Sequence, residues 1–205
     1  MCSRFELNST PREIAARFDL FDAPVLANRQ EFRPTDRILV IDAPGQSGFR
    51  AWGIPAPWDG SPIFNARSES VAEKPTFRPY LDGRCLIPAS AWFEWRKEGQ
   101  GGKQTRHKTR IAPAEESERP FVFAGLCDGE HATILTAAAI PSLAEIHGRM
   151  PVVLDRDQAR TWMTGDPITG AGDLLRPHDV GTLTGEPADP AHANPKPPAQ
   201  PDLFG

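Results

Sequence analysis

The chain has 205 residues, of which 39% are hydrophobic and 24% are charged, so it can bury the core of one domain. It has neither a run of about 18 apolar residues nor the charged-then-apolar layout of a secretory signal, so we expect a cytoplasmic protein without membrane contact. A formal net charge of -4 argues against a protein that coats nucleic acid through bulk positive charge.

The predicted elements are mostly short strands. A helix is expected from Pro11 to about Phe18, because Thr10 to Glu13 reads as a capping box with proline in the first helical position. A second helix is expected over 156–163, after Asp155 as its N-cap. Short apolar or β-branched runs bounded by Gly, Pro or Asp predict strands at 38–41, 49–52, 84–87, 92–95, 121–124 and 133–136. Strands without long helices between them indicate an antiparallel sheet assembly.

Two stretches depart from this pattern of short apolar strands. Residues 99–119 are polar and basic, and they are interpreted as a hairpin loop or an insertion. After about Asp173 prolines crowd a segment with few apolar residues, which predicts a disordered tail. We therefore expect one folded domain over residues 1–172 and a Pro-rich tail over 173–205.

The second residue is a cysteine. If Met1 is removed, Cys2 carries a free α-amine and a thiol on adjacent carbons, and such a 1,2-aminothiol traps aldehydes. An ordinary residue at a frayed chain end is the alternative. The spacing of the three cysteines fits neither a disulfide framework nor a zinc site, so Cys85 and Cys127 are expected to be core thiols.

"ASAWFEWR" places a carboxylate among aromatic residues. In an extended segment Trp92, Glu94 and Arg96 share one face. Desolvation among aromatic rings would favour the protonated form of Glu94 and make it a candidate proton donor or shuttle. A surface carboxylate paired with Arg96 is the alternative.

Two further motifs are polar. "IFNARSES" puts Asn65, Arg67, Ser68 and Glu69 together just beyond an apolar pair, at a strand end, although Asn and Ser are also ordinary turn residues. "EIHGRMP" puts His147 beside Arg149, and an imidazole next to a guanidinium can handle both a proton and a phosphate. A structural histidine is the alternative.

Five motifs in chain order, "MCSRF", "NARSES", "RCLIPASAWFEW", "ILTAAA" and "IHGRMPVVL", resemble the SRAP family, the SOS-response-associated peptidases now regarded as abasic-site processing proteins. The resemblance runs from Met1 to about Met163. It implies one compact α+β domain with a mixed, largely antiparallel sheet curled into a pseudo-barrel and few short helices. It also implies that the mature N-terminal cysteine crosslinks to abasic sites in single-stranded DNA.

The family's catalytic residues carry over to Cys2, Asn65, Glu94 and His147. In the implied mechanism the Cys2 amine attacks the aldehyde of the opened sugar, and the thiol then closes a thiazolidine. Glu94 is assigned to proton transfer in these steps and His147 to proton transfer at the sugar hydroxyl. Asn65 is assigned to holding the N-terminal segment and the sugar in register. No cofactor or metal is expected.

Basic and aromatic residues near these motifs are expected to hold the DNA. Between residues 60 and 110 there are ten Lys or Arg against five acids, which favours an anionic ligand locally. The expected DNA contacts are Arg4, Trp58, Arg67, Arg78, Thr136 and Arg149. The chain departs from the family at Ser3 and Gly148, where glycine and aspartate are usual, and at 31–35, where an N-x-A-P-T loop has lost its asparagine.

The chain ends in "QPDLFG". Gln200, Asp202, Leu203 and Phe204 resemble the Q-x-D-L-F peptide by which bacterial proteins dock on the replication sliding clamp, and a Pro-rich tether would give this peptide reach. A chain end without a function is the alternative.

Two other functions stay open. The first is peptidase action, with Cys2 as nucleophile and His147 as base. The second is a noncatalytic module that binds single-stranded DNA and recruits partners. In each case we expect a monomer.

Overall fold

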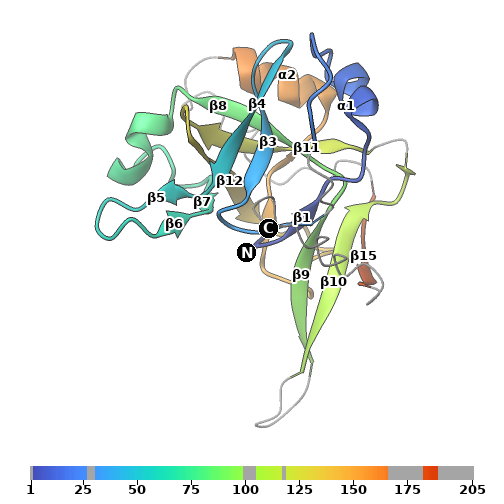
Figure 1. Ribbon diagram of the computed structural model, residues 1–205. Helices are drawn as coiled ribbons and strands as arrows, with labels where there is room; N and C mark the ends of the chain where they lie inside the picture. The colour runs from blue at the N-terminus through green and yellow to red at the C-terminus, as the bar shows by residue number, and fades with distance from the viewer. Residues whose placement is uncertain (1, 27–30, 99–104, 117–118, 166–181, 189–205) are drawn as a thin grey trace, which may run out of the picture.

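Two β-sheets and a small two-stranded sheet build the molecule, with short helices at one end (Figure 1). The computed structural model describes residues 2–26, 31–98, 105–116, 119–165 and 182–188. The five-stranded sheet has the order β15 (Leu183–Pro187), β10 (Thr105–Pro113), β9 (Ala91–Glu98), β1 (Phe5–Glu6) and β2 (Glu31–Phe32). The two-stranded sheet pairs β5 (Ile54–Pro55) with β6 (Pro62–Ile63).

The eight-stranded sheet closes on itself. Its order is β13 (Arg149–Pro151), β12 (His131–Ala138), β4 (Gln46–Trp52), β3 (Arg37–Ala43), β8 (Arg84–Ala89), β11 (Phe121–Cys127) and β14 (Val153–Leu154), with β7 (Asn65–Arg67) paired to β12. Because β11 also pairs with β12, strands β12, β4, β3, β8 and β11 form a ring. Within the described ranges only β12–β4 and β12–β7 are parallel. The predicted α+β fold with a largely antiparallel pseudo-barrel is confirmed.

The helices begin where their capping residues predict. Helix α1 (Pro11–Arg17) follows Thr10, whose hydroxyl accepts from the Glu13 N–H while the Glu13 carboxylate accepts from the Thr10 N–H. Helix α2 (Arg156–Thr164) follows Asp155 in the same way. A 3-10 helix, η1, spans Pro75–Tyr80. Each of the predicted strands lies inside one of β3, β4, β8, β9, β11 and β12.

An aromatic cluster holds the beginning of the chain in the core. The Phe5 ring lies 5.1 Å from both the Phe32 and Trp52 rings and 5.8 Å from that of Phe123, measured between centroids. Phe5 is 1% exposed. Burying such a side chain stabilises the fold by roughly 1.5–3 kcal/mol, so the N-terminal segment is a structural element.

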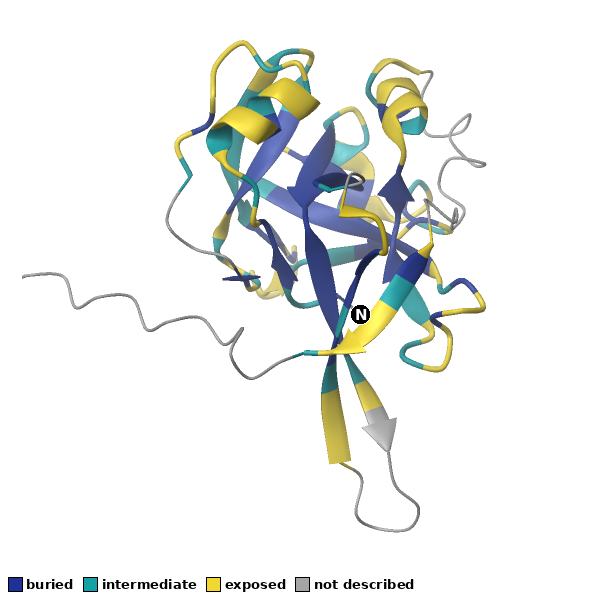
Figure 2. Ribbon diagram, turned by 90° about the vertical axis from the view of Figure 1, so that its right-hand side faces the viewer, coloured by how far each residue is buried: buried dark blue, intermediate teal, exposed yellow. Residues whose placement is uncertain are grey.

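The polar stretch 99–119 contains a strand that the sequence did not predict. Strand β10 pairs antiparallel with β9 from Thr105 opposite Glu98 to Ile111 opposite Trp92, and the two strands form an arm whose outer part is exposed (Figure 2). The outer residues have no core to face, so their side chains are polar. Only the inner part, from Ile111 to Pro113, is continuously buried.

The predicted domain boundary after residue 172 is wrong, because β15 lies beyond it. Strand β15 pairs with β10 from Leu183 opposite Pro113 to Pro187 opposite Thr109. Leu183 is buried in the main core, while the following residues are half-buried or exposed. A single apolar residue among prolines and polar residues gives too weak a pattern to predict an edge strand. The clamp-like residues 200–204 lie outside the described ranges.

No helix in the described part of the chain is long and apolar enough to cross a membrane.

The place of β15 in the fold can be tested at Leu183. Because Leu183 is 3% exposed in the core, Leu183→Ala should lower the free energy of unfolding by about 2–4 kcal/mol in urea denaturation. Val25→Ala, at a side chain that is 88% exposed, is the control and should change little. Equal stability of both variants and the parent chain would mean that β15 adds nothing to the fold.

Candidate functional site

Strand pairing places the beginning of the chain against Glu94. Strand β1 runs antiparallel to β9 with Phe5 opposite Trp92, and the Phe93 N–H donates to the Arg4 carbonyl oxygen at 2.9 Å. Continuing this register puts the residues before Arg4 beside Glu94 and the residue after it. Cys2 is fully buried, and Glu94 is 2% exposed. The interpretation of Glu94 as a surface carboxylate is therefore wrong.

Asn65 ties the barrel to the N-terminal segment. It begins β7, which lies parallel to β12 with Asn65 opposite Ile134. Its side-chain nitrogen donates to the Cys2 carbonyl oxygen at 2.6 Å. Its Oδ1 is buried and has no hydrogen-bond partner among the described residues. Buried polar atoms are normally paired, so this oxygen is an acceptor that a substrate O–H or N–H can use.

His147 completes the cluster from the loop before β13. Its Nδ1 lies 3.0 Å from both the backbone nitrogen and the carbonyl oxygen of Arg149. When the Arg149 N–H donates to Nδ1, the neutral ring carries its proton on Nε2. Burial raises the pKa of the Glu94 carboxyl, and the nearby His147 imidazole partly offsets that rise.

Burial also keeps the thiol protonated. It raises the pKa of Cys2 well above its usual range, and the charge of Glu94 adds to this effect. Hydrogen bonding with the Arg4 backbone acts in the opposite direction. The sulfur therefore needs a proton acceptor before it can attack. Glu94 is adjacent, and its raised pKa makes it a better acceptor than an ordinary carboxylate.

A buried acid orients two cations beside this cluster. Glu31 accepts from Arg4 and from Lys108, each at 2.6 Å. Burial alone would raise the pKa of Glu31, but these two partners lower it below its ordinary value. The Arg4 guanidinium also lies over the Trp95 ring, 5.8 Å from its centroid. Glu31 begins the segment that departs from the family pattern, and here it anchors a candidate DNA contact.

Three of the expected DNA contacts lie on the surface. Trp58 is 69% exposed, and Arg67 and Arg78 are exposed. Trp95, which is half-buried beside Arg4, was not predicted from the sequence to be a site residue. Its contact with Arg4 depends on the pairing of β1 with β9, which no local sequence pattern announces.

Of the other expected DNA contacts, Thr136 is buried and Arg149 is half-buried. Thr136 is fully buried, and its hydroxyl donates to the Ala66 carbonyl oxygen at 3.2 Å. Direct DNA contact through this side chain is not possible in this conformation. Arg149 donates to the Glu69 carboxylate and, at 2.6 Å, to the Thr136 carbonyl oxygen. Its guanidinium is therefore already engaged inside the protein.

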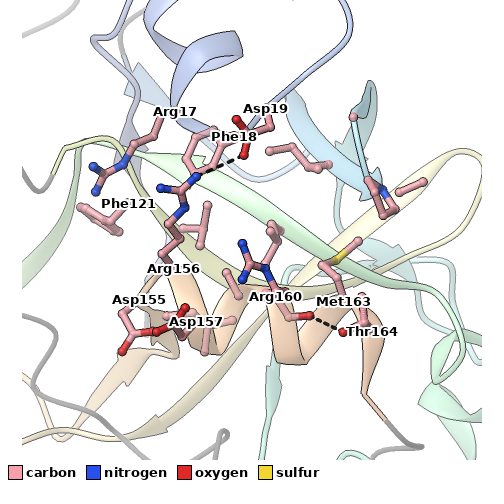
Figure 3. Close-up of a pocket in the computed structure, with 18 of the residues that line it drawn as sticks. Arg17, Phe18, Asp19, Phe121, Asp155, Arg156, Asp157, Arg160, Met163 and Thr164 are labelled. Atoms are coloured by element: carbon pink, nitrogen blue, oxygen red, sulfur yellow. Dashed lines mark hydrogen bonds and ion pairs between the residues drawn. The ribbon is translucent and has the colours of Figure 1, made fainter.

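A separate pocket of about 650 Å³ lies between the end of α1 and α2 (Figure 3). Phe18 and Phe121 contribute to its apolar lining, and the ion pair of Asp19 with Arg156, at 3.2 Å, lies at its edge. None of its lining residues belongs to the cluster around Cys2. In the described residues, no three His, Cys, Asp or Glu side chains are grouped to hold a metal ion.

Comparison with known proteins gives one family. The family model described as "SOS response associated peptidase (SRAP)" matches residues 1–191, which includes β15. The chain is 31% identical to "Abasic site processing protein YoaM" of Bacillus subtilis, over 89% of this chain and 88% of that protein. It is 32% identical to "Abasic site processing protein YedK" of Escherichia coli, over 80% and 79%. A crystal structure from Bacteroides thetaiotaomicron has the same fold, with a TM-score of 0.78 at 22% identity over 92% of this chain and 93% of that one.

The raised pKa of Glu94 has a measurable consequence for stability. A carboxyl whose pKa is higher in the folded than in the unfolded state loses stabilisation as pH rises from its ordinary value, about 4.3, through the raised one. Glu94→Gln removes this loss. The Tm of the variant minus the Tm of the parent chain should therefore be a few degrees higher at pH 8 than at pH 4.

Glu73→Gln is the matched control, because Glu73 is exposed. Its difference from the parent chain should stay flat over the same range. If the Glu94→Gln curve is equally flat, Glu94 is not desolvated in solution.

Proposed function

Because this chain belongs to the SOS response associated peptidase (SRAP) family, we propose that it crosslinks to abasic sites in single-stranded DNA through mature Cys2. The observation that carries the proposal is the hydrogen bond from Asn65 to the Cys2 carbonyl oxygen, at 2.6 Å, with buried Glu94 alongside. An abasic deoxyribose in its open form presents an aldehyde. An amine and a thiol on adjacent carbons are the groups that capture an aldehyde in a stable ring.

The chemistry proceeds in two bond-forming steps. The Cys2 amine attacks the aldehyde carbon, and the resulting carbinolamine loses water to give an imine. The Cys2 sulfur then adds to the same carbon, and the thiol proton passes to the ring nitrogen. The five-membered thiazolidine that forms is the crosslink, and one water is lost overall. With an ordinary α-amine pKa near 7.7–8.0, about a tenth of the amine is free base at pH 7.

The neighbouring residues move or hold protons in this scheme. Glu94 accepts the thiol proton and returns it to nitrogen, and it also protonates the departing hydroxyl of the carbinolamine. His147 transfers a proton at the sugar hydroxyl during ring opening. Asn65 holds the N-terminal segment, and its unpaired Oδ1 accepts a hydrogen bond from the sugar or the amine. None of this begins until Met1 is removed, because the Cys2 nitrogen is otherwise part of a peptide bond.

Exposed basic and aromatic residues hold the DNA around the lesion. Arg67 and Arg78 contact phosphates, and Arg4 does so while it stays oriented by Glu31. Trp58 and Trp95 supply ring faces for unpaired bases, each worth about 1–3 kcal/mol. Thr136 is buried, so it supports the site only by accepting hydrogen bonds from Arg149.

The C-terminal tail brings the protein to its place of action. We assign Gln200, Asp202, Leu203 and Phe204 to binding the bacterial sliding clamp, which would bring the protein to replication forks in the cytoplasm. This assignment rests on sequence alone and is independent of the crosslinking chemistry. We also propose that the protein acts as a monomer.

Substitution of Cys2 tests the crosslink. With an oligonucleotide that carries one abasic site, the parent chain should give a heat-resistant adduct on a denaturing gel. Cys2→Ala should lower the yield of this adduct by at least about a hundredfold, since the thiol is lost. Cys2→Ser keeps the amine, so it should give a transient imine that is trapped only when borohydride is added.

An intact oligonucleotide and a casein-derived peptide in parallel lanes separate the other functions. Binding of intact DNA without any adduct would favour a noncatalytic module. Peptide cleavage that needs Cys2, without an adduct, would favour a peptidase. A heat-resistant adduct from Cys2→Ala would disprove the proposed chemistry.

Deletion of residues 200–205 tests the tail. Crosslinking should be unchanged, while binding to purified bacterial sliding clamp, measured by surface plasmon resonance, should fall by at least about tenfold. Leu203→Ala with Phe204→Ala should reproduce the deletion, because these side chains supply the apolar anchors. Unchanged clamp affinity in both variants would show that the tail does not bind the clamp.

A further inference from the structure

Arg149 is fixed by a carboxylate and a strand. Both terminal nitrogens of its guanidinium donate to the Glu69 carboxylate, one of them at 2.9 Å to Oε2. The same Nη2 lies 2.6 Å from the Thr136 carbonyl oxygen and 3.2 Å from its hydroxyl. This bidentate contact lowers the pKa of Glu69 below its ordinary value. The Arg149 side chain is 19% exposed, so little of it is offered to solvent.

The ion pair joins two segments that carry the proposed chemistry. Glu69 lies two residues after β7, and the Ser68 N–H donates to the same Thr136 carbonyl oxygen that Arg149 contacts, at 2.9 Å. Strand β7 begins with Asn65. On the other side, Arg149 begins β13, and its backbone N–H donates to His147 Nδ1 at 3.0 Å. Asn65 and His147 are therefore held on opposite sides of one charged contact.

The backbone of Arg149 suits both protonation states of the imidazole. In the neutral ring, Nδ1 accepts from the Arg149 N–H. In the protonated ring, Nδ1 can donate to the Arg149 carbonyl oxygen, which is also 3.0 Å away. In both states Nε2 carries a proton, and when the protonated ring gives that proton up, Nδ1 keeps its own and goes on donating to the Arg149 carbonyl oxygen. This arrangement works only while the Arg149 backbone is held still, and the Glu69 contact holds its side chain.

We propose that Glu69 is a positioning residue, which acts through Arg149 to hold His147 in register with Asn65 and Cys2. The inference rests on the proposed crosslinking function and adds a residue to its machinery. Glu69 touches no reacting atom. Its effect should appear in the rate of reaction of bound DNA, because both terminal nitrogens of Arg149 already donate to Glu69 or Thr136.

Glu69→Gln is the test, because it keeps the shape of the side chain and removes its charge. With saturating abasic single-stranded DNA, the single-turnover crosslinking rate should fall about tenfold, as for other residues that orient a catalytic group. The pH profile of that rate should also change, since His147 is no longer held. The dissociation constant for single-stranded DNA with a tetrahydrofuran abasic analogue, which cannot open, should stay within about twofold.

Glu73→Gln is the matched control. Glu73 lies four residues further along the chain and is exposed, so the substitution removes the same charge without touching Arg149. It should leave rate, pH profile and affinity unchanged. Thermal unfolding of each variant checks that the fold is intact, and Glu69→Asp, which keeps the charge but shortens the reach, should fall between the parent chain and Glu69→Gln.

A double variant decides whether the effect passes through the imidazole. In a His147→Gln background, Glu69→Gln should cause no further loss, because both changes remove the same function. Independent, multiplying losses would overturn the inference. A saturating rate that is unchanged by Glu69→Gln, with tighter binding to the analogue, would also overturn it and identify Arg149 as a phosphate contact that Glu69 restrains. If the parent chain forms no adduct, the proposed function itself fails.

Discussion

Burial of Phe5 is the constraint on which the site depends. Chain ends usually fray, because nothing repays the entropy of ordering them. Here an aromatic side chain close to the N-terminus packs against Trp52 and Phe123, and β1 pairs with strands on both sides. Cys2 is three residues away and has little freedom left. A terminal amine can act as a positioned nucleophile only if the segment that carries it is as rigid as the barrel around it.

The same burial gives the site its electrostatic character. It disfavours the thiolate of Cys2 and the carboxylate of Glu94 together, so the pair resists carrying two negative charges. Burial therefore favours the protonated form of both groups. The ionised carboxylate is a cost to the fold, and the unpaired Asn65 Oδ1 is another. Sites that keep such groups buried give up stability for reactivity.

Local rules predicted much of this fold, and the failures share one cause. Thr10 and Asp155 specify the starts of their helices within one turn, and runs of apolar residues predict the buried strands. Strand β10 was missed because its outer residues are polar on both faces, and β15 because Leu183 is its only buried residue. Sequence left open whether Glu94 is buried, because the answer lies in its pairing with β1. Glu69 was noted only as part of a polar cluster, and its pairing with Arg149 could not be predicted, since Arg149 is 80 residues further along the chain.

Acids placed beneath basic side chains explain how a chain with a net charge of -4 can carry a DNA site. Glu31 holds Arg4 and Lys108, and Glu6 holds Arg110. Glu6 and Glu31 are buried, so they orient the cations from behind. A long cationic side chain loses much rotamer entropy when it binds a phosphate, and a partner that orients it beforehand lowers that loss. In the net charge these acids count as groups that repel DNA. Their positions instead let them orient the basic side chains toward the DNA.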